Sequence, residues 1–270
     1  MTRLVEDDIR HIRKTIKAYD NSFKRQTGYS MKDVAACAAE TVPSENCVTA
    51  VVPFTCGQGI ISGFAEAVCA ILKYCDVPAF VTEKTDVNGI YEAVLRQADI
   101  IFMADDERFV AFGVSEEAMA ENGKCTGEGF AEALLRAMEE ERNEKVLVLG
   151  ASAVGSAAAD YLLKRGIAVD MYDIDYEMLE RADVCSTGLT KLKDRPVFRE
   201  YKYLYDATTA SGLISDEDVG KDTVIAAPGM PLGVTEQACK QAKVIHNPLE
   251  LGVMTMYYNC LGQMLQKESR

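Results

Sequence analysis

A short segment with two glycines, VLVLGASAVG from Val146 to Gly155, has the residue types and spacing of a phosphate-binding turn. Four apolar residues lead directly into Gly150, and Gly155 follows five positions later. Such a turn must bend sharply, bring its backbone close to a pyrophosphate and open a helix whose free N–H groups face the phosphates. Gly150 allows the bend, and Gly155 allows close packing of helix and strand. The segment therefore predicts a dinucleotide site.

The neighbouring residues refine this prediction. Ser152 stands where such turns have a middle glycine, but its side chain is small and its hydroxyl can donate to a phosphate oxygen. The next predicted strand ends at Asp173, 23 residues after Gly150. A carboxylate there binds the ribose hydroxyls of NAD and repels the extra phosphate of NADP. No Lys or Arg follows before Arg181, so we expect NAD as the cofactor.

Later strand ends supply further candidates, because ligands of parallel sheets bind beyond the carboxyl ends of the strands. Thr208 and Thr209 follow YLYDA, and Pro228-Gly229 follows TVIAA, although Pro-Gly is also a common turn without a ligand. The expected cofactor-binding residues are Gly150, Ser152, Ala153, Val154, Gly155, Asp173, Ile174, Thr208, Thr209 and Pro228.

The same rule selects polar residues in the first half of the chain. Thr55-Cys56-Gly57 follows the apolar run VVPF, and Asp105-Asp106 follows IIFMA. A carboxylate at Asp105 either pairs with a substrate ammonium group or caps the turn that follows it. Both interpretations remain open from the pattern alone.

A catalytic pair is harder to find. Cys56 is a candidate nucleophile, but the chain has only two histidines, His11 and His246, and neither is near Cys56 in the sequence. His246 ends a predicted strand and is either a general base or a histidine satisfied at the rim of the core. No catalytic residue is assigned from the sequence.

The elements that position these residues alternate between strands and helices, which predicts parallel sheets and an α/β fold. We expect a smaller N-terminal α/β substrate domain over residues 1–126 and a C-terminal Rossmann-type NAD-binding domain over residues 127–270. The amphipathic helix 126–141 connects the domains, and the C-terminal helix is assigned to the second one. Asp86 is expected to cap the helix that follows it.

Composition excludes several classes of function. The net charge of −13 argues against nucleic acid as a partner and is compatible with a cationic substrate. No apolar run approaches a membrane span, and the N-terminus lacks the apolar stretch of a secretory signal. The 9 cysteines form no C-x-x-C pair, so a metal site is not expected, and reduced thiols fit a cytoplasmic protein.

Several short segments follow one another in a characteristic order and spacing: MADD at 103–106, Asn122 with Cys125-Thr126-Gly127, VLVLGASAVG, MYDID, APGMP, NPLELG and a final helix containing MYY. By these segments the chain resembles the pyrrolysine synthase family over nearly its whole length, from Leu4 to Tyr258. Ser152 and Cys56 depart from the family pattern, which has glycine and serine at these positions.

The resemblance implies a two-domain NAD enzyme that binds 3-methylornithyl-lysine, a small cationic dipeptide-like substrate, at the domain interface. NAD would take a hydride from the carbon that carries the terminal amine, and ring closure with loss of ammonia and water would give pyrrolysine. Leu4 implies a first helix that folds over the site as a lid. The implied substrate residues are Leu4, Thr55, Cys56, Asp105, Asn122 and Leu251.

Other functions share these features. A related NAD dehydrogenase of the dipicolinate-synthase or methylenetetrahydrofolate-dehydrogenase type would have the same cofactor domain, and a non-catalytic NAD sensor would bind cofactor without turnover. Cofactor domains of this type often pair, so a homodimer is a further expectation that the sequence does not decide.

Overall fold

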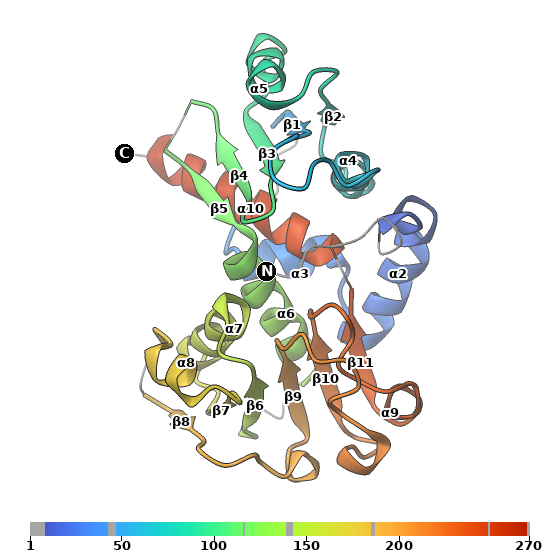
Figure 1. Cartoon of the computed structure of the whole chain (residues 1–270), viewed down its shortest axis with the longest axis vertical. Helices are drawn as coiled ribbons and strands as arrows, with labels where there is room; N and C mark the ends of the chain where they lie inside the picture. The colour runs from blue at the N-terminus through green and yellow to red at the C-terminus, as the bar shows by residue number, and fades with distance from the viewer. Residues whose placement is uncertain are drawn as a thin grey trace. The chain divides into compact units, whose positions relative to one another are not determined.

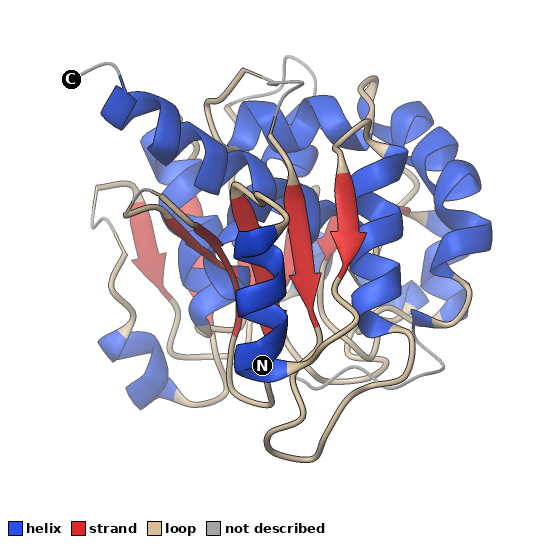
Figure 2. Ribbon diagram, turned by 90° about the horizontal axis from the view of Figure 1, so that it is seen from above, coloured by secondary structure: helices blue, strands red, loops and turns tan. Residues whose placement is uncertain are grey.

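The computed structural model describes residues 9–42, 47–115, 117–138, 143–184, 187–247 and 249–268. The described chain forms two compact units, each built on its own sheet. Unit 1 contains residues 1–21, 31–125 and 249–270, and unit 2 contains residues 22–30 and 126–248. Helices lie beside the strands of both sheets (Figure 2).

Unit 1 is built on a mixed sheet of five strands in the order β2-β1-β3-β4-β5. The three parallel strands β1, β2 and β3 were expected, whereas the antiparallel extension by β4 and β5 was not. The elements are α3 (Met31–Ala38), β1 (Thr49–Val52), α4 (Phe64–Tyr74), β2 (Ala79–Val81), α5 (Asp86–Leu95), β3 (Ile100–Ala104), β4 (Phe109–Gly113), β5 (Met119–Glu121) and α10 (Glu250–Glu268).

The C-terminal helix α10 belongs to unit 1 and packs against α3, α4, β4 and β5 (Figure 1). The expected division placed this helix in the second domain, so that part of the prediction was wrong. Apolar side chains lie on nearly all sides of the helix, and Leu251, Val253, Met254 and Met256 are fully buried. A helix that is apolar all round must be enclosed by other elements. In unit 1 these elements are α3, α4, β4 and β5, which lie far from α10 in the sequence.

Two helices contribute residues to both units. The helix α2 (Ile12–Thr27) runs from unit 1 into unit 2 at Ser22, and α6 (Asn122–Ala137) does so at Thr126. Within unit 2, α6 packs closely on α7, because a Cβ at Gly127 would lie 2.5 Å from the carbonyl oxygen of Val154. The division inside α6 falls between Cys125 and Thr126, one residue before the expected domain boundary at residues 126–127.

Unit 2 is built on a parallel sheet of six strands in the order β11-β10-β9-β6-β7-β8, which is the order of a dinucleotide-binding Rossmann domain. The short edge strand β8 was not predicted from the sequence. The elements are β6 (Val146–Leu149), α7 (Ala153–Lys164), β7 (Val169–Tyr172), α8 (Tyr176–Arg181), β8 (Leu189–Lys191), η1 (Phe198–Glu200), β9 (Tyr203–Asp206), η2 (Asp216–Asp218), β10 (Val224–Ala227), α9 (Glu236–Gln241) and β11 (Lys243–His246).

The central strands of unit 2 are buried on both faces, as continuous apolar runs predict for parallel strands. One face carries the side chains of Leu147, Leu149 and Ile225, which pack with Ala238 of α9. On β9, the hydroxyl of Tyr205 donates to the carbonyl of Gly127 in α6 at 3.3 Å. Helices therefore cover the sheet and leave the carboxyl ends of its strands as the place for a ligand.

Candidate functional site

The turn after β6 has the geometry that its two glycines predict. Gly150 has a φ of +94°, a left-handed conformation that side chains disfavour, and its N–H donates to the carbonyl of Tyr172 at 2.8 Å. A Cβ at Gly155 would overlap the carbonyl oxygen of Gly150. The turn and the first turn of α7 can approach each other this closely only because position 155 has no side chain.

The helix α7 begins without a side-chain cap. Ser152 is its N-cap residue but accepts no capping hydrogen bond, and Ala153 and Val154 open the helix. The first N–H groups of a helix have no partner within the helix, and together with the helix dipole they attract anions. With serine in place of glycine at position 152, the first N–H groups of α7 still have no side-chain cap.

Asp173 links the end of β7 to the turn. Its Oδ2 accepts a hydrogen bond from the N–H of Ala151 at 2.6 Å, and its Oδ1 accepts from the N–H of Asp175 at 2.8 Å. Among the described residues no other hydrogen bond to this carboxylate is seen, so each oxygen has a further lone pair available to a hydroxyl donor. Ile174 is 93% exposed beside it and is available to cover a ligand.

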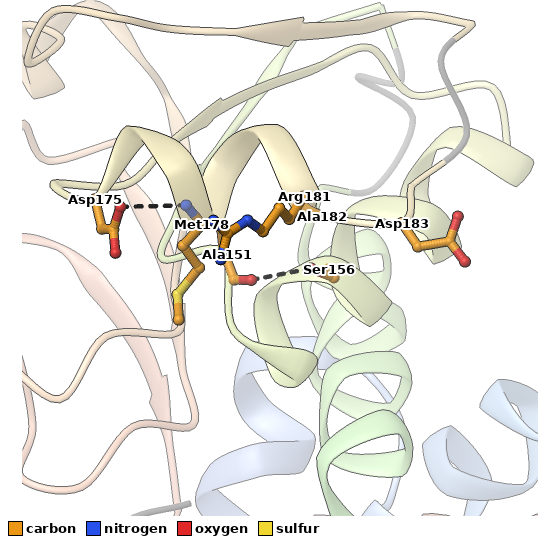
Figure 3. A pocket seen from close by; sticks show the side chains of 7 residues that line it. All are labelled: Ala151, Ser156, Asp175, Met178, Arg181, Ala182 and Asp183. Atoms are coloured by element: carbon orange, nitrogen blue, oxygen red, sulfur yellow. Dashed lines mark hydrogen bonds between the residues drawn. The ribbon is translucent and has the colours of Figure 1, made fainter.

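A pocket of about 370 Å³ lies next to this linkage (Figure 3). Ala151 and Ser156 come from the turn and α7, and the other side chains come from α8 and its flanks. The lining residues are Ala151, Ser156, Asp175, Met178, Arg181, Ala182 and Asp183. This volume falls in the range of small-molecule sites. The glycine turn, the uncapped helix and the pocket are together compatible with a bound dinucleotide.

The later strand ends of unit 2 meet the same turn. A Cβ added at Gly150 would lie 3.4 Å from the Cγ2 atom of Thr208, so this side chain packs against the turn. Thr209 is exposed. Pro228 is buried at the end of β10, and a Cβ on the following Gly229 would overlap the carbonyl oxygen of Thr208. The structure thus brings Thr208 and Pro228-Gly229 together beside Gly150.

In unit 1, carboxylates join the loop after β1 to the segments that follow β2 and β3. Thr55 donates its N–H and its hydroxyl to the two carboxylate oxygens of Asp86, both at 2.8 Å. Asp106 Oδ2 accepts from the N–H of Gln58 at 2.6 Å. Because β1 and β3 are adjacent parallel strands, these bonds gather Thr55, Cys56 and Asp105 at one edge of the sheet.

Asp105 performs the turn-capping role that was one of its two interpretations. Its Oδ1 accepts from the N–H groups of Glu107 and Arg108 at 2.8 and 2.7 Å. These backbone hydrogen bonds lower the pKa of the exposed carboxyl, so it is ionised at neutral pH. Its Oδ2 makes no hydrogen bond to the described residues and remains available to a cation. The two roles are therefore compatible.

Asp86 does not cap α5 as expected. Its carboxylate binds Thr55 instead, the N-cap position is Thr85, and Asp86 adopts a φ of +53°. The hydrogen bond from the Thr55 N–H is the main cause of its lowered pKa. A residue with a strained backbone and an ionised carboxylate that organises a loop is typical of a functional site. No local pattern in the sequence indicates this pairing, because the two residues are 31 positions apart.

The remaining substrate candidates have different environments. Asn122 is half-buried at the start of α6, whereas Leu251 is fully buried in α10, among the core residues of unit 1. Cys56 is exposed, and no hydrogen bond joins its thiol to a histidine among the described residues. Leu4 lies outside the described residues. In the part of the chain that is described, no group of three metal-ligating side chains is present.

The fold of the chain defines its class of protein. The fold is that of Rossmann-type dehydrogenases: a quinate dehydrogenase from Corynebacterium glutamicum in complex with NAD matches with a TM-score of 0.52 and 11% identity over 80% of this chain and 92% of that one. A shikimate dehydrogenase from Aquifex aeolicus matches with a TM-score of 0.51 and 14% identity over 85% and 95%. At such low identity these matches show the fold alone.

The chain belongs to the pyrrolysine synthase family. It is 33% identical over 264 residues to the pyrrolysine synthase of Methanosarcina acetivorans, covering 97% of this chain and all of that protein. The pyrrolysine synthase of Methanosarcina barkeri is 32% identical over 263 residues, with coverage of 97% and 98%. Residues 8–120 match the model of the N-terminal domain of the pyrrolysine biosynthesis protein PylD. Among the described residues, no helix has the length and apolar character needed to cross a membrane.

His246 gives a testable consequence of the geometry at the end of β11. Its Nδ1 lies 2.6 Å from the carbonyl oxygen of Ala227, so Nδ1 carries the proton and donates it. Burial lowers the pKa of His246, and this hydrogen bond opposes the shift only in part. The unfolded chain therefore binds a proton near pH 6.5 that the folded protein does not, and stability must fall as the pH drops through that region.

We predict that His246→Gln removes this part of the pH dependence. As the pH falls from 7 to 5, the wild-type protein should lose more stability than the variant. The difference between their free energies of unfolding should change by at most about 1.4 kcal/mol per pH unit. Urea unfolding at several pH values measures the difference. His11→Gln, which changes the exposed histidine, is the control, and identical pH profiles for all three proteins would contradict the prediction.

Proposed function

We propose that this protein oxidises the carbon carrying the terminal amine of 3-methylornithyl-lysine with NAD, and that loss of ammonia and ring closure with loss of water then give pyrrolysine. The observation that supports this proposal is the turn at Gly150–Gly155, which is hydrogen-bonded to Asp173 through the Ala151 N–H. The membership of the chain in the pyrrolysine synthase family supports the choice of substrate. When bound, NAD would supply the hydride acceptor. The protein supplies binding, orientation and electrostatics.

The choice of NAD over NADP is based on charge. Asp173 would present its carboxylate to the ribose hydroxyls, where an additional phosphate would be repelled. Arg181, the nearest cation in the sequence, lines the pocket, but it pairs with Glu177 at 3.1 Å and shares the pocket with Asp175 and Asp183. A pocket containing two carboxylates is unfavourable for a phosphate dianion.

The loops of unit 1 supply the charge that a cationic substrate needs. The substrate proposed here carries three amines and one carboxylate. The ionised carboxylate of Asp105 has one oxygen free of the described residues, and Asp86 and Asp106 hold the neighbouring Thr55 and Gln58 in place. We assign Asp105 to an ammonium group of the substrate and Asn122 to a polar substrate group.

The proposed function is tested by mixing the protein with NAD and 3-methylornithyl-lysine, or the simpler ornithyl-lysine, and recording NADH absorbance and product mass. We expect NADH together with a product lighter by one ammonia and two hydrogens, because water gained on release of ammonia is lost again on ring closure. NAD binding without NADH formation would contradict the proposal and favour a non-catalytic NAD sensor.

The role of Asp105 can be separated from its structural role by Asp105→Asn. The amide oxygen still accepts from Glu107 and Arg108, so the turn is kept and only the charge is lost. We expect the KM for the substrate to rise about fivefold, as loss of an exposed ion pair predicts, while NAD affinity and the melting temperature stay constant.

The control for this variant is Asp76→Asn, which removes an exposed carboxylate of unit 1 that pairs with Lys32. This change should leave the substrate KM unaltered. If Asp105→Asn also leaves the KM unaltered, Asp105 is only a turn residue and the ammonium contact must be assigned elsewhere.

A further inference from the structure

Asp206 is a carboxylic acid buried at the edge of the proposed cofactor site. It is the last residue of β9, and parallel pairing sets it level with Leu149, the residue that precedes Gly150. Its side chain has no exposed surface. A fully buried carboxyl is rare without a partner that stabilises its charge, so its position beside a ligand-binding turn requires an explanation.

The two oxygens of Asp206 have different surroundings. Oδ1 accepts from the N–H of Thr208 at 3.0 Å and from the Thr208 hydroxyl at 2.7 Å. Oδ2 is buried and makes no hydrogen bond to the described residues, and a Cβ at Gly233 would overlap it. Among these residues, no Lys, Arg or His forms an ion pair with Asp206.

Burial disfavours the charged form of this side chain. It raises the pKa of Asp206, and the hydrogen bonds from Thr208 lower it only in part. Oδ1 can accept from Thr208 whether or not the carboxyl is charged, so the link to Thr208 does not depend on a negative charge.

The segment held by Asp206 is in contact with the cofactor turn. The Ala207 N–H donates to the Leu149 carbonyl at 2.9 Å, and the Ala207 carbonyl lies 3.2 Å from the position of a Cβ at Gly150. The Thr208 hydroxyl in turn accepts from the Ala210 N–H at 3.4 Å. Asp206, Thr208 and Ala210 therefore form a chain of hydrogen bonds that sets the path of residues 207–210 against the turn.

We propose that Asp206 is a positioning residue for the dinucleotide, which acts by holding Thr208 and the 207–210 loop against the turn at Gly150. This inference rests on the proposed function, because it requires a dinucleotide at the carboxyl ends of β6 and β9. Asp206 itself is enclosed by protein and does not touch the ligand. Its contribution is to fix the loop in advance, so that less conformational entropy is lost on binding.

The test is calorimetric titration of NAD into Asp206→Ala and Asp206→Asn. Asp206→Ala should weaken NAD binding about tenfold, as the loss of a loop-ordering hydrogen-bond pair predicts. Asp206→Asn should bind within about twofold of the wild type, because an amide keeps the Oδ1 acceptor without a charge. Rescue by the uncharged isostere distinguishes positioning from a requirement for the carboxylate charge.

The matched control is Asp170→Ala, which removes another buried carboxylate of the same sheet. Asp170 lies on β7, level with Leu147 and nearer the amino ends of the strands, and it accepts from Lys145 at 3.0 Å and from Tyr201 at 2.8 Å. This variant should lower the melting temperature and leave NAD affinity unchanged. A general loss of stability would therefore not be mistaken for a positioning effect.

The outcomes separate the inference from the proposed function. The positioning role would be overturned if Asp206→Ala folds and binds NAD as tightly as the wild type. It would also be overturned if Asp206→Asn binds NAD as weakly as Asp206→Ala. If Asp206→Ala does not fold, Thr208→Val breaks the same link from its other end, and unchanged affinity would again overturn it. A wild-type protein that binds no NAD would overturn the proposed function, and this inference with it.

Discussion

The close approach of three backbone segments at the carboxyl ends of β6, β9 and β10 is the constraint on which the proposed cofactor site depends. A Cβ at Gly155 would overlap the Gly150 carbonyl, and a Cβ at Gly229 would overlap the Thr208 carbonyl. Only glycine allows both contacts. Because the backbones meet here, α7 begins immediately after the turn, and its uncapped N–H groups face the position of an anion.

Carboxylates that accept backbone N–H groups organise the loops of both units. Asp173 holds Ala151, Asp106 holds Gln58, and Asp86 holds Thr55. Each bond joins the segment after one strand to the segment after another, and a charged acceptor makes such a bond stronger than a neutral hydrogen bond. Asp206 uses the same geometry in a buried position, where the cost of removing a charge from water raises the pKa of the carboxyl.

These loops show how a chain with few catalytic side chains can serve a reaction of the proposed kind. In such a reaction the cofactor would supply the hydride acceptor, and the substrate would supply the amine that closes the ring. What remains for the protein is to hold both in place and to match the charge of the substrate. Ordered loops, an ionised Asp105 and a dinucleotide turn meet these needs without an acid–base pair.

Local patterns in the sequence predicted the parts of the fold that local chemistry determines. The apolar run before Gly150, the following helix and Asp173 at the end of the next strand all lie where expected. The strand ends of unit 2 also lie together as the parallel-sheet rule predicts.

Long-range packing explains what the sequence did not predict. The helix α10 follows β11 directly but completes the core of unit 1, and only tertiary contacts reveal that. The strands β5 and β8 have three residues each, too few for a clear alternation of apolar side chains. The partners of Asp86 and the burial of Asp206 depend on contacts between residues that are distant in the sequence, and no local pattern indicates such contacts.

The most direct test of this account is calorimetric titration of NAD and of NADP into the wild-type protein and Asp173→Ala. The account predicts that the wild type binds NAD more tightly than NADP. Asp173→Ala should weaken NAD binding about tenfold while the protein stays folded, because the carboxylate that would meet the ribose and that holds Ala151 is removed. Equal NAD affinity for the wild type and the variant would contradict the assignment of this turn as the dinucleotide site.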